Sequence, residues 1–250
     1  MNILLTNDDG YTSEGIHALY NILSKSHKVF VLAPLSQKSA VGHGITINRS
    51  MKLQKITHGF ALEGTPADCV KVAVYGMFKD VKFDLVLSGI NDGCNLGTDV
   101  FYSGTCAGAR EGLINKIPGI AVSMCRPVDK EKLSAAADLT AKLVDKISDT
   151  LLKEKMILNI NFPSKHFFKE LRLTKLGLRF YNESIYVEDK DGISYASVLY
   201  PDQLFFNNME NSDLDCIESG AVSITPMTND FFSPPDFDKL SSMIFNFKLT

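Results

Sequence analysis

The segment Asn2–Gly10, which reads NILLTNDDG, decides the fold of this chain. Its apolar residues run directly into two adjacent carboxylates, Asp8 and Asp9, and a glycine. A short apolar run that is closed by a turn signal is typical of a strand buried on both faces of a parallel sheet. The carboxylates then lie at the carboxyl end of that strand, where open α/β sheets bind their ligands.

The adjacent carboxylates have two interpretations. Two like charges side by side repel each other unless a cation or hydrogen-bond donors compensate them, which points to a divalent metal ion at the strand tip. In the other interpretation, Asp8 or Asp9 caps the helix that follows. The local sequence leaves both open.

Strands and helices alternate outward from this segment. A helix over 14–25 and a strand over 28–33 complete a βαβ unit. The pattern predicts further strands over 83–88, 119–124 and 156–161 and further helices over 66–79, 104–115 and 132–152. We therefore predict an α/β fold, a mostly parallel sheet with helices on both faces, over residues 1–163. Short extended pieces at 52–56 and 60–62 predict a hairpin outside this sheet.

The pattern changes after residue 163. Segments 186–187 and 195–200 flank the turn Asp189–Gly192, which indicates antiparallel hairpins. We predict a hairpin-rich extension over 164–250, with a short helix over 213–220, a strand over 221–226 that returns to the core, and an amphipathic tail around 240–247. Its aromatic side chains suit a subunit interface or a lobe that covers the same subunit; they include Phe180, Phe205 and Phe206.

Composition excludes several classes of protein. A chain of 250 residues with 45% hydrophobic and 22% charged residues is that of an ordinary globular protein. The net charge of −3, without a basic tract, does not indicate binding to a nucleic-acid polymer. The sequence shows no signal-peptide pattern and no apolar stretch of membrane-spanning length, so we expect a cytoplasmic location and no membrane partner.

The cysteines are odd in number and have no CxxC spacing, which argues against structural zinc and against a disulfide framework. We expect reduced, mostly buried thiols; they are Cys69, Cys94, Cys106, Cys125 and Cys216. The five histidines are also widely separated. Any metal should therefore be magnesium or manganese, bound by oxygen ligands.

Three predicted strand ends carry hard oxygen donors. Asp8 and Asp9 follow the first strand, Ser39 follows the second and Asn91 follows the third. These donors suit a magnesium ion that also binds substrate oxygens. The helix that begins near Ser103 offers free amides to a phosphate. A metal beside such amides is the machinery of phosphate-ester hydrolysis.

Other residues of this region have competing interpretations. Thr65, Pro66 and Asp68 form a helix start, so we assign Asp68 to a capping box rather than to catalysis. His43 is either a loop histidine bonded to the backbone or a group that contacts phosphate or transfers a proton. Because Ser39 and His43 are close in the sequence, hydrolysis by a serine nucleophile is an alternative, but the sequence contains no GxSxG nucleophile elbow. P-loop and dinucleotide-binding glycine motifs are also absent from the sequence.

Several segments together resemble the SurE survival proteins, a family of metal-dependent 5′-nucleotidases. NILLTNDDG is similar to the family's N-terminal signature, and APLSQKSAVGHGIT is similar to its second loop. SGINDGCNLGTDVFYSGT, GTPADCV and SGAVSITP also resemble family segments. By this resemblance, Asp8, Asp9, Ser39 and Asn91 bind one Mg²⁺ or Mn²⁺ ion per subunit. Asp8 is the stronger candidate for the general base or nucleophile.

The resemblance also implies a Rossmann-like core, a substrate and an assembly. The expected reaction is hydrolysis of nucleoside 5′-monophosphates, with 3′-monophosphates and short polyphosphate as further substrates. The C-terminal extension would form a homodimer or homotetramer. Around the substrate phosphate, the resemblance places Asn95, Ser103, Gly104 and Thr105.

Three positions depart from the family pattern, in which the second loop more usually reads APDxxRS. This chain has Leu35 and Lys38 there, and Gly44 where a small hydroxyl is frequent. None of these is an expected ligand, so we expect activity, and the departures leave the substrate preference open. Two rival functions remain: a non-catalytic nucleotide- or phosphate-binding sensor, and a serine esterase that uses Ser39 and His43.

Overall fold

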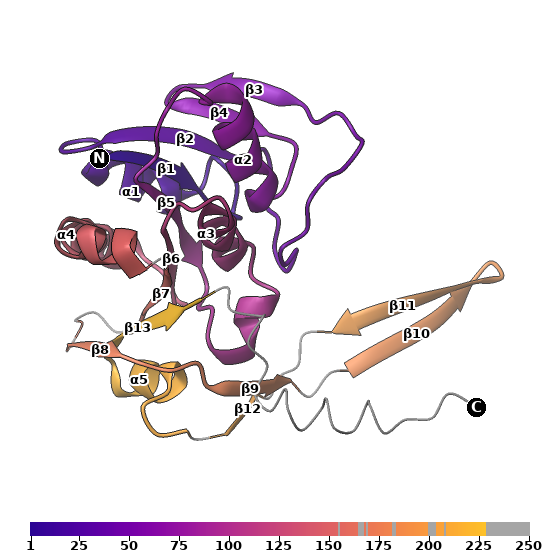
Figure 1. Cartoon of the computed structure of the whole chain (residues 1–250). Helices are drawn as coiled ribbons and strands as arrows, with labels where there is room; N and C mark the ends of the chain where they lie inside the picture. The colour runs from indigo at the N-terminus through magenta and orange to yellow at the C-terminus, as the bar shows by residue number, and fades with distance from the viewer. Residues whose placement is uncertain are drawn as a thin grey trace, which may run out of the picture.

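Strand β1 (Asn2–Thr6) lies inside a nine-stranded sheet in the computed structural model (Figure 1). The structure describes residues 1–154, 156–164, 168, 170–181, 184–199, 204–207 and 209–228. In spatial order the strands are β3 (Leu53–Ile56), β4 (Gly59–Leu62), β2 (Lys28–Pro34), β1, β5 (Leu85–Asp92), β6 (Gly119–Met124), β7 (Ile157–Phe162), β13 (Val222–Met227) and β8 (Leu171–Leu173).

Six consecutive strands of this sheet, from β4 to β7, run parallel to their neighbours. Strands β3 and β13 are antiparallel to β4 and β7, respectively. Helices α1 (Glu14–Leu23) and α4 (Lys130–Glu154) cover one face, and α2 (Pro66–Val72) and α3 (Gly104–Ile114) cover the other (Figure 1). The predicted α/β class, with a mostly parallel sheet and helices on both faces, is confirmed.

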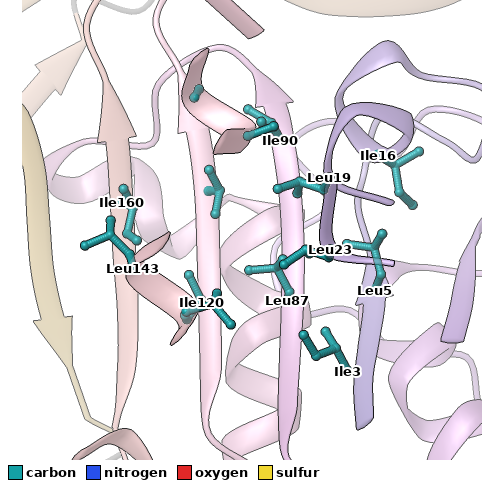
Figure 2. Close-up of a cluster of buried hydrophobic side chains, with 14 of the residues drawn as sticks. Ile3, Leu5, Ile16, Leu19, Leu23, Leu87, Ile90, Ile120, Leu143 and Ile160 are labelled. Carbon is teal, nitrogen blue, oxygen red and sulfur yellow. The ribbon is translucent and has the colours of Figure 1, made fainter. Parts of the chain in front are cut away.

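The side chains of β1 explain its central place. Ile3 and Leu5 point to the face covered by α1 and α4, where they pack in one core cluster (Figure 2). Leu4 belongs to a second cluster on the face of α2. All three are fully buried. A continuous apolar run is required because both faces of this strand lie under helices.

The hairpin of β3 and β4 corrects one prediction. We expected it to lie outside the sheet, but β4 pairs in parallel with β2 and so extends the sheet at its edge. Phe60 and Leu62 give the physical reason, because both pack in the core cluster on the face of α2. Gly59 permits the pairing: a Cβ there would lie 2.2 Å from the carbonyl oxygen of Val31.

The extension contributes to the sheet and also leaves it. Strand β13 lies beside β7, β8 pairs with the other edge of β13, and the short helix α5 (Asp213–Ser219) precedes β13. Strand β9 (Leu178–Tyr181) pairs with β12 (Leu204–Asn207). Strands β10 (Ser184–Lys190) and β11 (Ile193–Leu199) form a hairpin that projects from the body (Figure 1). The predicted amphipathic tail around 240–247 lies outside the described residues.

No helix in the described part of the chain is both long and apolar enough to cross a membrane.

The start of α2 has the predicted capping box. The Thr65 side chain accepts a hydrogen bond from the Asp68 amide (3.1 Å), and the Asp68 carboxylate accepts one from the Thr65 amide (2.9 Å). Asp68 also accepts bonds from the amide and hydroxyl of Thr46, both at 2.8 Å. Asp68 is therefore a structural residue that ties the second loop to the helix start. A π-helical turn, Ala73–Met77, continues α2.

Replacing Thr65 by Ala should lower the free energy of unfolding by about 1 kcal/mol, because the Asp68 amide loses its acceptor and the Gly44 carbonyl loses its donor. Urea denaturation measures this difference. Thr57→Ala is the matched control, since Thr57 is exposed in the turn between β3 and β4. Equal stability of both variants would show that the capping bond contributes nothing.

Candidate functional site

The carboxylate of Asp8 is built into the start of α3. Asp8 is 5% exposed, and its Oδ1 accepts a hydrogen bond from the Thr105 hydroxyl. Ser103 is the N-cap of α3, and its hydroxyl accepts a hydrogen bond from the Cys106 amide (3.0 Å). A Cβ on Gly104 would lie 2.8 Å from the Cβ of Asp8, so only glycine allows the helix to start this close. The tip of β1 and the amino end of α3 thus form one unit.

The helix cap that we considered for Asp8 or Asp9 is not formed on α1. Ser13 is the N-cap of α1, and its hydroxyl accepts a hydrogen bond from the Asn7 side chain (2.8 Å). Both carboxylates are thus left for other partners.

The end of β5 meets Asp9. Asp9 Oδ2 accepts the amide of Asp92 (3.0 Å), and the Asn91 side-chain nitrogen donates to the Gly93 carbonyl (2.7 Å). Within the described residues these bonds leave Oδ1 of Asp9 and Oδ1 of Asn91 without a hydrogen bond, so both oxygens are available as metal ligands. Both residues line a cavity of about 310 Å³ together with Ser13 and Gln37.

The second loop, which follows β2, is bonded to the tip of β1 through its main chain. The Lys38 amide donates to the carbonyl oxygen of Asp8 (2.7 Å), which places the exposed Ser39 next to the tip of β1. Gly10 has a φ of +94°, and a Cβ there would lie 3.3 Å from the Ser36 backbone. Three segments therefore converge on the Asp8–Asp9 pair: the start of α3, the end of β5 and the second loop.

This environment is unfavourable to negative charge. Burial, together with the charge of Asp9, raises the pKa of Asp8 to about 6, although the bond from Thr105 opposes the shift. Burial also raises the pKa of Asp9, with the Asp92 amide acting in the opposite direction. Two carboxylates with raised pKa values on adjacent residues form a site that a cation would stabilise.

His43 bridges the second loop and α3. Its Nε2 lies 2.8 Å from the carboxylate of Glu111, which also binds the Lys71 ammonium (3.0 Å). Burial alone would raise the pKa of Glu111, but the bonds from His43 and Lys71 hold it below its ordinary value. The partner of His43 is thus a side chain rather than the backbone. The structure has no hydrogen bond between Ser39 and His43, both of which are described residues.

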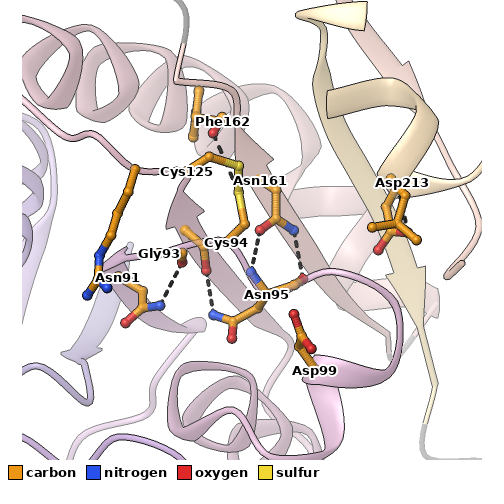
Figure 3. The surroundings of a disulfide bond; sticks show 12 residues. Asn91, Gly93, Cys94, Asn95, Asp99, Cys125, Asn161, Phe162 and Asp213 are labelled. Atoms are coloured by element: carbon orange, nitrogen blue, oxygen red, sulfur yellow. Dashed lines mark hydrogen bonds between the residues drawn. A yellow bond between two sulfur atoms is a disulfide. The ribbon is translucent and has the colours of Figure 1, made fainter. Parts of the chain in front are cut away.

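Asn95 is buried and held by a ladder of polar side chains (Figure 3). Its amide donates to the Asn161 side chain (2.8 Å), and its own side chain donates to Ser123 (2.7 Å). Its carbonyl accepts bonds from the side chains of Asn159 (2.8 Å) and Asn161 (3.0 Å). Sequence reasoning missed these partners, although asparagines at alternate positions of a buried strand were a signal.

A disulfide corrects the prediction that all thiols are reduced. Cys94 and Cys125 are bonded, with Cα atoms 4.6 Å apart, and join the loop after β5 to the end of β6 (Figure 3). The sequence does not indicate this disulfide, because the two cysteines meet only when the loop after β5 folds back onto the end of β6. The other three cysteines are free and buried: Cys69, Cys106 and Cys216.

The extension also holds this loop, through residues that the sequence analysis did not assign. Asp213 is fully buried, and its carboxylate accepts the amides of Gly97 and Gly177, both at 2.8 Å. Asp99 binds Arg179 and the hydroxyl of Tyr181. Only the folded arrangement brings these distant segments together.

The described residues contain no cluster of three or more His, Cys, Asp or Glu side chains that could hold a metal. The set Asp8, Asp9, Ser39 and Asn91 contains only two carboxylates, so its remaining oxygens would come from a hydroxyl and an amide.

The raised pKa of Asp8 predicts a pH-dependent stability in chelator-treated protein. The folded state retains the Asp8 proton up to about pH 6, whereas the unfolded chain releases it near 3.8. This contribution is complete below about pH 4 and is lost as the pH rises through 6, a change on the order of 3 kcal/mol. Urea denaturation from pH 4 to 7 should show a larger loss in the wild type than in Asp8→Asn, which keeps the contribution of other carboxylates with a raised pKa, such as Asp9. Parallel curves for the two proteins would contradict it.

Comparison with known proteins places this chain in a family. The family model described as "Survival protein SurE" matches residues 3–183. A "5'-nucleotidase SurE" from Campylobacter jejuni is 40% identical over 237 residues, covering 91% of this chain and 92% of that protein. One from Petrotoga mobilis is 39% identical over 254 residues, covering 98% and 99%. The crystal structure of a SurE protein from Aquifex aeolicus superposes with a TM-score of 0.82 at 34% identity, covering 98% of this chain and 99% of that one. The resemblance noted in the sequence is confirmed: this chain belongs to the SurE survival protein family.

Proposed function

We propose that this chain hydrolyses nucleoside 5′-monophosphates to a nucleoside and phosphate, as a metal-dependent phosphomonoesterase. The observation that carries the proposal is the bond from the Thr105 hydroxyl to the Asp8 carboxylate, because it joins an acidic site to the amino end of a helix. Helix amino ends bind phosphate, and paired oxygen ligands bind divalent cations. Relatives named 5′-nucleotidase support the substrate class.

Asp8, Asp9, Ser39 and Asn91 would hold one Mg²⁺ or Mn²⁺ ion. The free Oδ1 atoms of Asp9 and Asn91, and the raised pKa values of the two carboxylates, fit such a cation. When bound, the ion would polarise a phosphoryl oxygen and neutralise charge that develops on the phosphate.

The protein's own groups would orient the phosphate and accept a proton. The amino end of α3, at Gly104 and Thr105, would lie against the phosphate oxygens, and Ser103, Asn95 and His43 would surround them. Asp8 would act as the general base. Its Oδ1 accepts a bond from the Thr105 hydroxyl, and the carboxylate would both hold the ion and take a proton from the attacking water. A pKa of about 6 keeps this carboxylate mostly ionised at neutral pH.

Asp9→Asn should lower phosphate release from AMP more than about a hundredfold, because a charged ligand is lost. The assay measures inorganic phosphate with and without Mn²⁺ or Mg²⁺, and a chelator should abolish wild-type activity. Asp80→Asn, at an exposed turn, is the matched control. Circular dichroism checks that both variants fold.

The same assay separates the rival functions. A binding module would bind AMP without releasing phosphate. A serine esterase would turn over without metal and would react with a serine-directed reagent. A fully active Asp9→Asn enzyme would show that the assignment of Asp9 as a metal ligand is wrong. A panel of nucleoside 5′- and 3′-monophosphates and short polyphosphate defines the preference.

We also propose that residues 1–163 form the catalytic core and that the 164–250 extension assembles a homodimer or homotetramer. The register of the projecting hairpin supports this. Ile185 pairs with Val198 and Val187 with Ala196, so one face of the hairpin is entirely apolar at these positions. Ile185, Val187 and Val198 are 64%, 60% and 71% exposed in the single chain. A contiguous apolar face of this kind marks an interface.

Val198→Asp should shift the protein towards monomers, because it places a charge on the apolar face. Size-exclusion chromatography with light scattering measures the mass. Ser197→Asp adds the same charge to the opposite face of the same strand and should leave the mass unchanged. The interface assignment is wrong if the two variants have the same mass.

A further inference from the structure

Two aromatic side chains next to the proposed phosphate site face solvent. Phe101 and Tyr102 are 57% and 63% exposed. Phe101 ends the 3₁₀ helix Gly97–Phe101, and Tyr102 directly precedes Ser103, the N-cap of α3. Among the described residues, neither ring takes part in an aromatic pair. Each therefore has a face available to a ligand.

The backbone that carries these rings is firmly held. The side chain of Val100, which directly precedes the two rings, is buried. The main-chain carbonyl of Asp99 accepts hydrogen bonds from the amides of Tyr102 and Ser103, both at 3.0 Å. The Gly42 amide donates to the carbonyl of Tyr102 (2.8 Å). Asp99 itself binds Arg179. Scattered exposed apolar side chains are common, but adjacent exposed rings on a fixed segment form a pre-organised binding surface.

The chain connectivity sets the distance to the phosphate. Consecutive Cα atoms are about 3.8 Å apart, so the Cα atoms of Phe101 and Ser103 are at most about 7.6 Å apart. In a nucleoside monophosphate one ribose separates the phosphate from the base. With the phosphate at the amino end of α3, the base would lie over the residues that directly precede this helix.

We propose that Phe101 and Tyr102 form an aromatic platform on which the base of a nucleoside monophosphate stacks. This inference rests on the proposed nucleotidase function and adds how that site recognises its substrate. Stacking uses the flat face that every base has, and it reads no base edge. The platform therefore selects nucleotides over phosphate esters that lack a base, with little choice among the bases.

The test compares AMP with ribose 5-phosphate, which keeps the sugar and phosphate but lacks the base. In the double variant Phe101→Ala/Tyr102→Ala, kcat/KM for AMP should fall about tenfold, or about 1.4 kcal/mol, mainly through a higher KM. The value for ribose 5-phosphate should stay within about twofold of the wild type. Single variants assign the loss to one or both rings, and Tyr102→Phe should restore wild-type discrimination.

Tyr75→Ala is the matched control, because Tyr75 is 69% exposed and lies in the π-helical turn beyond the far end of α2. Unchanged AMP kinetics in the double variant would overturn the platform. An equal loss with both substrates would also overturn it, since the rings would then only hold the backbone. A changed molecular mass with unchanged discrimination would show that the pair is a subunit contact.

Calorimetric binding of AMP and ribose 5-phosphate to Mn²⁺-loaded protein separates this proposal from the proposed function. If the wild type hydrolyses neither compound, the nucleotidase proposal fails. The platform still predicts tighter binding of AMP than of ribose 5-phosphate, and loss of that difference in the double variant. Equal affinities of the wild type for the two compounds would reject the platform itself.

Discussion

The burial of two adjacent carboxylates at the tip of an apolar strand, Asp8 fully and Asp9 in part, is the constraint on which this site depends. Strand β1 must be apolar to lie between helices on both faces, yet it ends in Asp8 and Asp9, whose pKa values burial raises. Two donors compensate in part: the Thr105 hydroxyl in α3 bonds the carboxylate of Asp8, and the Asp92 amide at the end of β5 bonds that of Asp9. The remaining deficit of positive charge is what a divalent cation would supply.

The loop between β5 and α3 is held by hydrogen bonds on both sides. Side-chain amides make these bonds on one side, and a carboxylate makes them on the other. Towards the core, Asn159 and Asn161 bind the main chain of Asn95. Towards the extension, the buried Asp213 carboxylate accepts the Gly97 amide. Because buried backbone groups must be paired, these contacts determine the course of a loop that has little regular structure. The extension thus shapes the candidate site in addition to presenting its exposed hairpin.

The sequence predicted the parts of the structure that rest on local periodicity. The alternation of apolar strands and amphipathic helices specifies the parallel sheet, and Thr65–Asp68 specifies a helix start by its own chemistry. The hairpin of β3 and β4 was misplaced because its parallel pairing with β2 is a long-range choice. The Cys94–Cys125 bond and the role of Asp213 were missed for the same reason. Contacts between distant segments leave no periodic signal in one sequence.

The departures from the family pattern in the second loop illustrate the difference between main-chain and side-chain anchoring. The Leu35 amide donates to the carbonyl of Leu62 (2.8 Å), and the Lys38 amide donates to that of Asp8. The Gly44 carbonyl accepts the Thr65 hydroxyl (2.7 Å). All three positions are therefore tied down by backbone atoms, which any side chain would leave in place. The loop can keep Ser39 beside Asp8 without the acid and arginine of the usual pattern, so the substitutions are free to alter what the loop presents to substrate.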